Sequence, residues 1–245
     1  MSRTWRLGVG FGLLLTGLAA APALAACAPD GTGHPAESFI FAQIQDPATC
    51  VEYLTSACEA VLISPTVAIT TGDCVVSWTV NTGFNITAWW ISNNPDDNID
   101  CGTADRVDSW HLHPNYDPAN PESPFNIGVI VLAAASTHPY ASLPAAGALD
   151  LLPHDQALDA VAYVDNGGPI DPLSRFVGTA ALGKTTQYTF KLRKAAGCTP
   201  DTAGSGVFLP GGQDLMGINL DSRGTQLRLD SPEVRDFLDD FVTLP

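Results

Sequence analysis

Short runs of β-branched and aromatic residues recur along the chain, and stretches that favour turns separate them. The turn stretches are rich in Asn, Asp, Gly and Pro, as at 92–98 and 165–169. Because such residues end strands, the alternation of short apolar runs with turns predicts an all-β chain. The apolar runs lie at 39–41, 61–63, 67–69, 127–132, 188–192, 207–209, 215–220 and 227–229.

One segment near the C-terminus has a helical period instead. Pro232 suits the first turn of a helix, and Ser231 stands before it as a candidate N-cap. Apolar residues then recur at a spacing of three and four, which places them on one helical face. We therefore expect an amphipathic helix at about 232–241, whose apolar face consists of Val234, Phe237, Leu238 and Phe241.

The first residues have the pattern of an export signal. Arg3 and Arg6 precede an apolar run at 7–18, and small residues follow it. We expect residues 1–26 to be a signal peptide and 27–245 to be the mature chain, secreted or in the cell envelope of a bacterium. Two processing alternatives remain open: small-x-small cleavage after 23–25, or a lipobox that leaves a lipid on Cys27.

Charge narrows the choice of partner. The formal net charge is −15, and it falls to −17 when residues 1–26 are removed, because they hold two arginines and no acid. Nucleic acids and anionic lipid surfaces need clustered Lys and Arg, which this sequence lacks. We expect no nucleic-acid partner, membrane contact only through a lipid on Cys27, and an unidentified protein or peptide as the partner.

The chain has six cysteines, and an exported chain meets an oxidising compartment. Disulfides are therefore expected, although six cysteines allow 15 pairings. A lipid on Cys27 would leave an odd number of thiols.

Several segments resemble the trypsin/chymotrypsin family of serine proteases when they are taken in order. The resemblance spans about 36–242, and Cys58 precedes Cys74 by the family's spacing of sixteen residues. The segments are 61–75 (VLISPTVAITTGDCV), 113–116 (HPNY) followed by 126–132 (NIGVIVL), 204–208 (GSGVF) and 215–218 (LMGI).

The resemblance implies two packed six-stranded antiparallel β-barrels and a C-terminal α-helix. The first barrel would occupy about 36–140 and the second about 150–230. The resemblance also implies a disulfide between Cys58 and Cys74. A second disulfide, between Cys50 and Cys101, is suggested by the expected packing of their loops.

The sequence departs from the family where the family has its catalytic triad. Asp73 stands at the position of the general base, and Asn126 at that of the aspartate which orients it. An aspartate carboxylate, with an ordinary pKa of about 3.9, is a poor general base and acid at neutral pH. An amide cannot stabilise an imidazolium. The Asn126 amide can, however, donate to the Asp73 carboxylate.

The nucleophile segment, 198–206, allows two alignments. Matching Gly204 and Gly206 places Ala203 at the nucleophile, which leaves no oxygen to attack a substrate. Counting from the cysteine places Thr202 there and Pro200 at an oxyanion donor, and proline has no N–H to donate. Neither alignment leaves a competent site, and the five histidines of the chain are expected at the surface or in turns.

Two function classes compete. The first is a non-catalytic binding or decoy protein that uses the loops of a trypsin fold, and the second is a serine endopeptidase with a non-standard site. No cofactor is expected, with one alternative. The acidic run that includes Asp96, Asp97 and Asp100 falls in the region of the family's calcium loop, where oxygen ligands can hold a hard cation. The same residues are also typical of a solvated turn, which would bind no ion.

Overall fold

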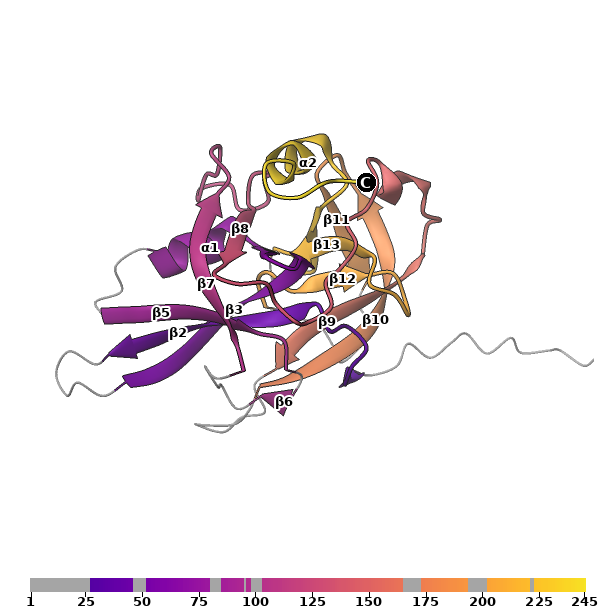
Figure 1. Ribbon diagram of the computed structural model, residues 1–245. Coiled ribbons are helices and arrows are strands. Elements are labelled where there is room, and N and C mark those ends of the chain that lie inside the picture. The colour runs from indigo at the N-terminus through magenta and orange to yellow at the C-terminus, as the bar shows by residue number, and fades with distance from the viewer. Residues whose placement is uncertain are drawn as a thin grey trace, which may run out of the picture.

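The computed structural model describes most of the chain after residue 26. Figure 1 shows the earlier strands, coloured indigo to magenta, beside the later strands, coloured salmon to yellow, with the terminal helix α2 above them. The described residues are 27–45, 52–79, 85–94, 96–97, 103–164, 173–193, 202–220 and 223–245.

The first barrel is closed by six antiparallel strands, paired in the order β2-β3-β4-β8-β7-β5. Alternate residues of each strand point inward, and the Cys58–Cys74 disulfide lies among them. Apolar side chains such as Ile40, Leu62 and Ile130 fill the interior. The strands are β2 (Glu37–Gln45), β3 (Glu52–Ser64), β4 (Val67–Thr70), β5 (Asn85–Ser92), β7 (Asp105–Leu112) and β8 (Gly128–Leu132).

The second barrel closes because β9 pairs with both β10 and β12. Two short strands that are not part of the barrel, β1 (Ala28–Pro29) and β6 (Asp96–Asp97), pair antiparallel with β10. Leu158, Phe190 and Met216 are among the residues that fill this barrel. Its strands are β9 (Ala157–Val164), β10 (Leu173–Thr185), β11 (Thr189–Arg193), β12 (Gly206–Phe208), β13 (Leu215–Asn219) and β14 (Thr225–Arg228).

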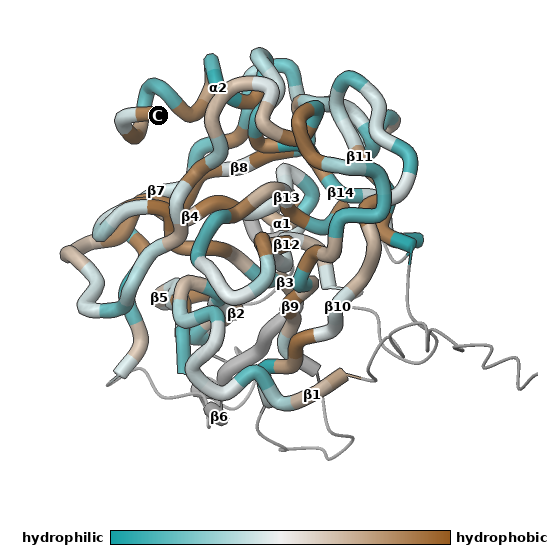
Figure 2. Tube along the Cα trace, turned by 90° about the vertical axis from the view of Figure 1, so that its right-hand side faces the viewer, coloured by the Kyte–Doolittle hydropathy of each residue, from teal (hydrophilic) through white to brown (hydrophobic). Residues whose placement is uncertain are grey.

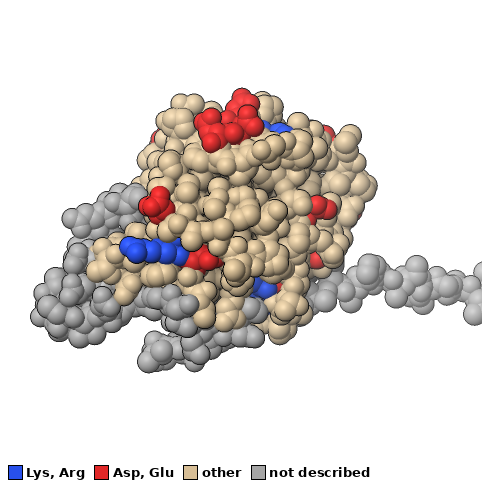
Figure 3. Space-filling model, viewed as in Figure 1, with Lys and Arg blue, Asp and Glu red and all other residues tan. Residues whose placement is uncertain are grey.

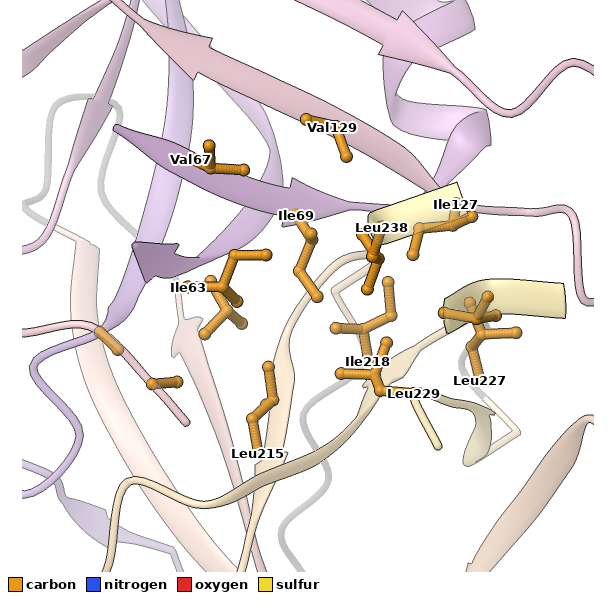
Figure 4. Packing of buried hydrophobic residues seen from close by; sticks show 14 of the residues in the cluster. Ile63, Val67, Ile69, Ile127, Val129, Leu215, Ile218, Leu227, Leu229 and Leu238 are labelled. Carbon is orange, nitrogen blue, oxygen red and sulfur yellow. The ribbon is translucent and has the colours of Figure 1, made fainter. Parts of the chain in front are cut away.

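A third apolar cluster joins the barrels and the helix α2 (Pro232–Leu238). Figure 4 shows Ile63, Ile69 and Val129 of the first barrel turned toward Leu215 and Ile218 of the second. Figure 2 shows that the apolar stretches, in brown, run mainly along strands. Burying the outer face of one barrel against the other removes apolar surface from water, which stabilises their joint.

The predicted fold is confirmed: two six-stranded antiparallel barrels are followed by a C-terminal helix. The helix is shorter than expected, because it ends at Leu238. Ser231 occupies the N-cap position, but its hydroxyl donates to the carbonyl of Arg228 at 3.2 Å and makes no capping bond. The helix α1 (Gly72–Thr79) and the 3₁₀ helix η1 (Ala148–Leu151) were not predicted.

The Cys58–Cys74 disulfide is confirmed. Cys27 is also disulfide-bonded. The pairing predicted for Cys50 and Cys101 lies outside the described residues. Within the part of the chain that the structure describes, no helix is long and apolar enough to cross a bilayer. On the face seen in Figure 3, acidic side chains gather over α2.

Candidate functional site

Asp73 lies in the first turn of α1, directly after β4 has ended. The disulfide from Cys74 to Cys58 ties this turn to β3. Gly72 lets a neighbouring ring approach closely, since a Cβ there would be 2.7 Å from the ring of Tyr116. The turn that carries Asp73 is thus held by a covalent bond on one side and by Tyr116 on the other.

The Asp73 carboxylate accepts hydrogen bonds on both oxygens. Asn126 donates from Nδ2 to Oδ2 at 2.7 Å, and its Oδ1 accepts the Asp73 backbone N–H at 3.0 Å. The Tyr116 hydroxyl donates to the other carboxylate oxygen. The predicted donation from Asn126 to Asp73 is therefore confirmed. The two side-chain donors to the carboxylate, an amide and a hydroxyl, both carry no charge.

Asn126 is fully buried, and the carbonyl of Pro121 fixes its orientation. Nδ2 donates to that carbonyl at 2.6 Å as well as to Asp73. Both amide protons thus have acceptors, and the amide oxygen has the Asp73 N–H. An aspartate at position 126 could make none of these donations.

Tyr116 was not predicted as a partner of Asp73, although it belongs to the HPNY segment of the resemblance. Burial raises the pKa of the Tyr116 hydroxyl, and the hydrogen bond to the Asp73 carboxylate and its charge raise that pKa further. Tyr116 therefore stays protonated and remains a donor at neutral pH. Nothing in the spacing of the two residues indicated this contact, because they are 43 positions apart.

Ala203 lies beside this site. Its carbonyl accepts the N–H of Glu59 at 2.9 Å and is 3.7 Å from the sulfur of Cys74, the residue after Asp73. The structure thus brings Ala203 of the second barrel to the α1 turn, as the resemblance implied. The side chain presented at this position is a methyl group.

Gly204 sets the course of the chain after Ala203. Its φ is +91°, and a Cβ would be 2.0 Å from the carbonyl oxygen of Glu59. A side chain at this position would therefore collide with the backbone of β3, and the left-handed conformation also favours glycine. The Gly204 N–H donates to the carbonyl of Asn219 at 3.0 Å, which holds the turn against β13.

The two hydroxyls on either side of this turn lie in other surroundings. The Thr202 hydroxyl hydrogen-bonds to the Glu59 carboxyl, and its carbonyl accepts from Asn219 at 3.1 Å. Ser205 is completely buried, and none of the described residues hydrogen-bonds to its hydroxyl. The structure therefore does not bring either hydroxyl into the hydrogen-bond network of Asp73.

Two histidines expected at the surface are buried, so that expectation was wrong for them. His113 is 7% exposed, stacks on the ring of Phe125 and makes a tilted contact with the ring of Phe237. Burial lowers the pKa of His113. His34 is 5% exposed and hydrogen-bonds to Asp30 at 2.6 Å. Both were expected at the surface or in a turn, but Phe237 of α2 packs against His113 and Phe208 of the second barrel packs against His34.

The calcium alternative stays a prediction. Asp96 and Asp97 form β6 and pair with β10, but their side chains, and all of Asp100, lie outside what the structure describes. No group of three or more His, Cys, Asp or Glu suited to a metal ion occurs among the described residues.

No protein-family model matches the chain, and no curated protein sequence is significantly similar to it. Solved structures do match. The VesB protease of Vibrio cholerae superposes with a TM-score of 0.61 at 14% identity, covering 88% of this chain and 66% of that one. A Glu endopeptidase matches with a TM-score of 0.61 at 11% identity, covering 88% and 95%.

The secreted serine protease VesC of Vibrio cholerae has a TM-score of 0.63 at 15% identity, with coverage of 88% of this chain and 48% of that one. The chain therefore spans less than two thirds of either Vibrio protein. At these identities the similarity shows the fold, which is that of the trypsin-like serine proteases.

Proposed function

We propose that this chain is a secreted trypsin-fold protein that binds a protein or peptide and does not hydrolyse it. The hydrogen bonding of Asp73 supports the proposal most directly. Both carboxylate oxygens accept from Asn126 and Tyr116 at the place where the family has its imidazole, and a methyl group stands at Ala203 where the family has its nucleophile.

The chemistry of the site supports the same proposal. A general base must have a free acceptor within hydrogen-bond reach of the hydroxyl that it activates. At Asp73 the acceptor oxygens already have donors, and Ala203 offers no hydroxyl. Asn126 cannot take the place of a carboxylate, because an amide gives no electrostatic stabilisation to a positive ring.

A serine-type endopeptidase with a non-standard site is the second candidate. It would need Thr202 or Ser205 as the nucleophile. The Thr202 hydroxyl is engaged with the buried Glu59 carboxyl, and the Ser205 side chain is enclosed. Neither arrangement offers a hydroxyl to a substrate, so the binding function is favoured.

The test is labelling of the purified mature chain with a fluorophosphonate probe, together with a search for turnover of peptide substrates. We expect neither labelling nor turnover. Thr202→Ala and Ser205→Ala are the matched variants. Peptidase turnover by the parent chain that either variant abolishes would identify the nucleophile and overturn the proposal.

Restoring the family's residues gives a second test. In serine proteases the loss of the serine or the histidine costs about as much as the loss of all three triad members, on the order of a millionfold in turnover, so Ala203→Ser alone should recover little. Asp73→His, Asn126→Asp and Ala203→Ser together are expected to give esterase activity that the parent lacks. Ala203→Ser alone is the control for a serine without its base.

We further propose that the mature chain is soluble and carries no lipid. Cys27 takes part in a disulfide, and a lipobox cysteine would instead need its sulfur for a thioether to the lipid. The intact mass of the mature chain separates the two processing alternatives. A mass increased by a diacylglyceryl group would contradict this proposal and leave the proposal on catalysis untouched.

A further inference from the structure

Two glutamates, Glu37 and Glu59, lie between the barrels on one face of the first. Glu59 of β3 stands opposite Phe39 of β2, and Glu37 is two residues from Phe39. Because side chains alternate along a strand, all three point to the same face. Phe39 packs edge-on against Tyr163 of the second barrel, so this face lies under β9. Both glutamates are buried, with 0% and 1% exposure.

Each carboxyl has one oxygen on a backbone donor of the second barrel. Glu37 Oε2 accepts the N–H of Gly206 at 2.9 Å, and Glu59 Oε1 accepts the N–H of Tyr163 at 2.9 Å. The other two oxygens, Glu37 Oε1 and Glu59 Oε2, are buried and have no donor among the described residues. The two carboxyls are themselves within hydrogen-bonding reach of each other. A proton between them would give both remaining oxygens a partner.

The nearest positive charge, Arg175, is already paired with another acid and does not balance the charge of the two glutamates. Arg175 of β10 faces the pair, but its Nε donates to Asp30 at 2.7 Å. The other guanidinium nitrogens donate to backbone carbonyls, including that of Glu37 at 3.2 Å, and to the Tyr163 hydroxyl. His34 also hydrogen-bonds to Asp30. Arg175 is therefore matched by Asp30, and two ionised glutamates would repel each other in a medium of low polarity.

The direction of the pKa shifts agrees with this geometry. Burial raises the pKa of Glu37 well above its ordinary value, and the charge of Glu59 raises it further. Burial raises the pKa of Glu59 to about 8, against the hydrogen bonds from its neighbours. Tyr163, the other titratable group at the pair, has a raised pKa because of its burial and stays neutral.

We propose that Glu37 and Glu59 hold one shared proton at neutral pH, and that this proton joins the barrels and fixes the turn that presents Ala203. The turn is reached through the Gly206 N–H on Glu37 and the Thr202 hydroxyl on Glu59. In mild alkali the proton passes to solvent and the two carboxylates repel each other. The contribution to stability is complete below the ordinary glutamate pKa of about 4.3 and is lost as pH rises through about 8.

The test is a pH titration of the ¹⁵N-labelled mature chain, followed through the amide resonances of Gly206 and Tyr163. In the parent chain both amides should shift with one midpoint near 8. In Glu37→Gln the amide oxygen still accepts from Gly206 and the amide nitrogen donates to Glu59, so this transition should disappear. Glu122→Gln, which changes an exposed glutamate paired with Arg223, is the control and should keep the transition.

Carboxyl resonances of the parent chain, labelled with ¹³C at the Glu side chains, decide the matter even if Glu37→Gln does not fold. One proton shared in the neutral range requires at least one of the two resonances to titrate above pH 6. Ordinary titration of both carboxyls near pH 4, or a transition of Gly206 that persists unchanged in Glu37→Gln, would overturn the proposal.

Discussion

Acidic side chains lie on both sides of the Cys58–Cys74 disulfide, and the two groups balance their charge differently. Asp73, next to Cys74, receives donations from an amide and a hydroxyl that carry no charge. Glu59, next to Cys58 on β3, lies near Glu37 of the neighbouring strand β2. One of its oxygens has a backbone donor, and the other has no donor among the described residues. One site is satisfied by the side chains around it, and the other needs a proton.

The difference shows that the hydrogen-bond donors around a buried carboxyl, more than its burial, decide whether the carboxyl needs a proton. Asn126 supplies a donor that an aspartate could not, and with Tyr116 it gives both oxygens of the Asp73 carboxylate a side-chain donor. At the joint of the barrels, Glu37 Oε1 and Glu59 Oε2 have no donor among the described residues, and the protonation of the pair should follow pH.

The largest effect is expected from Arg175→Met, which takes the cation from the joint. Arg175 is 2% exposed, and its removal leaves Asp30 with a buried charge and His34 as the remaining partner. Removing one partner of a buried ion pair costs about 3–5 kcal/mol. Urea unfolding followed by circular dichroism at pH 7 measures the loss.

Arg223→Met is the control for the loss of an arginine, because Arg223 pairs with Glu122 at 3.1 Å in an exposed position. Exposed pairs contribute about 0–1 kcal/mol. Equal losses in the two variants would show that the Arg175 cluster is not the stabilising centre of the joint.

The next effect is expected from Cys58→Ala with Cys74→Ala, which cuts the link between the two acidic groups. The bond closes a loop with a sequence separation of 16, and loops of that size correspond to about 3 kcal/mol in the chain-entropy model. The denaturation midpoint measures the loss. Because Cys74 also contacts the Ala203 carbonyl, amide shifts at Gly204 should accompany it, and unchanged shifts would separate the turn from the disulfide.

Asn126→Asp should make the first site resemble the second, since two carboxylates then face each other. We expect a loss of about 2 kcal/mol at pH 7, because Asp73 and Pro121 lose their donor and like charges repel. The loss should shrink as pH falls, because a proton shared between the two carboxyls removes the repulsion. Unfolding free energies measured between pH 3 and 8 test this.

The exchange variant, Asp73→Asn with Asn126→Asp, is the matched control because it keeps one amide and one carboxylate. It should recover the part of the loss that comes from repulsion, while the Pro121 carbonyl still lacks its donor. If the exchange variant is as unstable as the single variant, the loss comes from packing at position 126 and repulsion is not its cause.

The smallest effect is expected from Tyr116→Phe, which removes one donor from Asp73 and keeps the ring against Gly72. A lost hydrogen bond in a partly exposed site costs about 1 kcal/mol. Since the Tyr116 pKa is raised, the loss should be the same from pH 6 to pH 9. A loss that grows or fades within this range would show that Tyr116 ionises there.

The order of motifs predicted the barrels, the Cys58–Cys74 bond and the Asn126–Asp73 contact, because these follow from the local segments and from the resemblance. Glu37 and Glu59 were not singled out. Glu59 stands between Cys58 and Ala60, as a surface residue would, and Glu37 is the first residue of its strand; both are buried because the second barrel covers that face. A single strand pattern carries no information about what packs on its outer side.

The short helix α1 escaped prediction for a related reason. Its eight residues include Gly72 and two β-branched valines, which gives little helical preference. Two links stabilise the first turn of α1 despite its low helical propensity. They are the disulfide at Cys74 and the hydrogen bond from the Asp73 N–H to the Asn126 side-chain oxygen.

The Cys58–Cys74 bond also makes the backbone of the first barrel a stable scaffold for substitutions. The sulfur bridge fixes the backbone at Asp73 relative to β3 without any help from the Asp73 side chain. The Glu59 N–H on the Ala203 carbonyl then ties the facing turn to the same strand through main-chain atoms alone. A substitution at 203 therefore leaves both main-chain links in place, whereas a substitution at 73 also removes the acceptor of Asn126 and Tyr116.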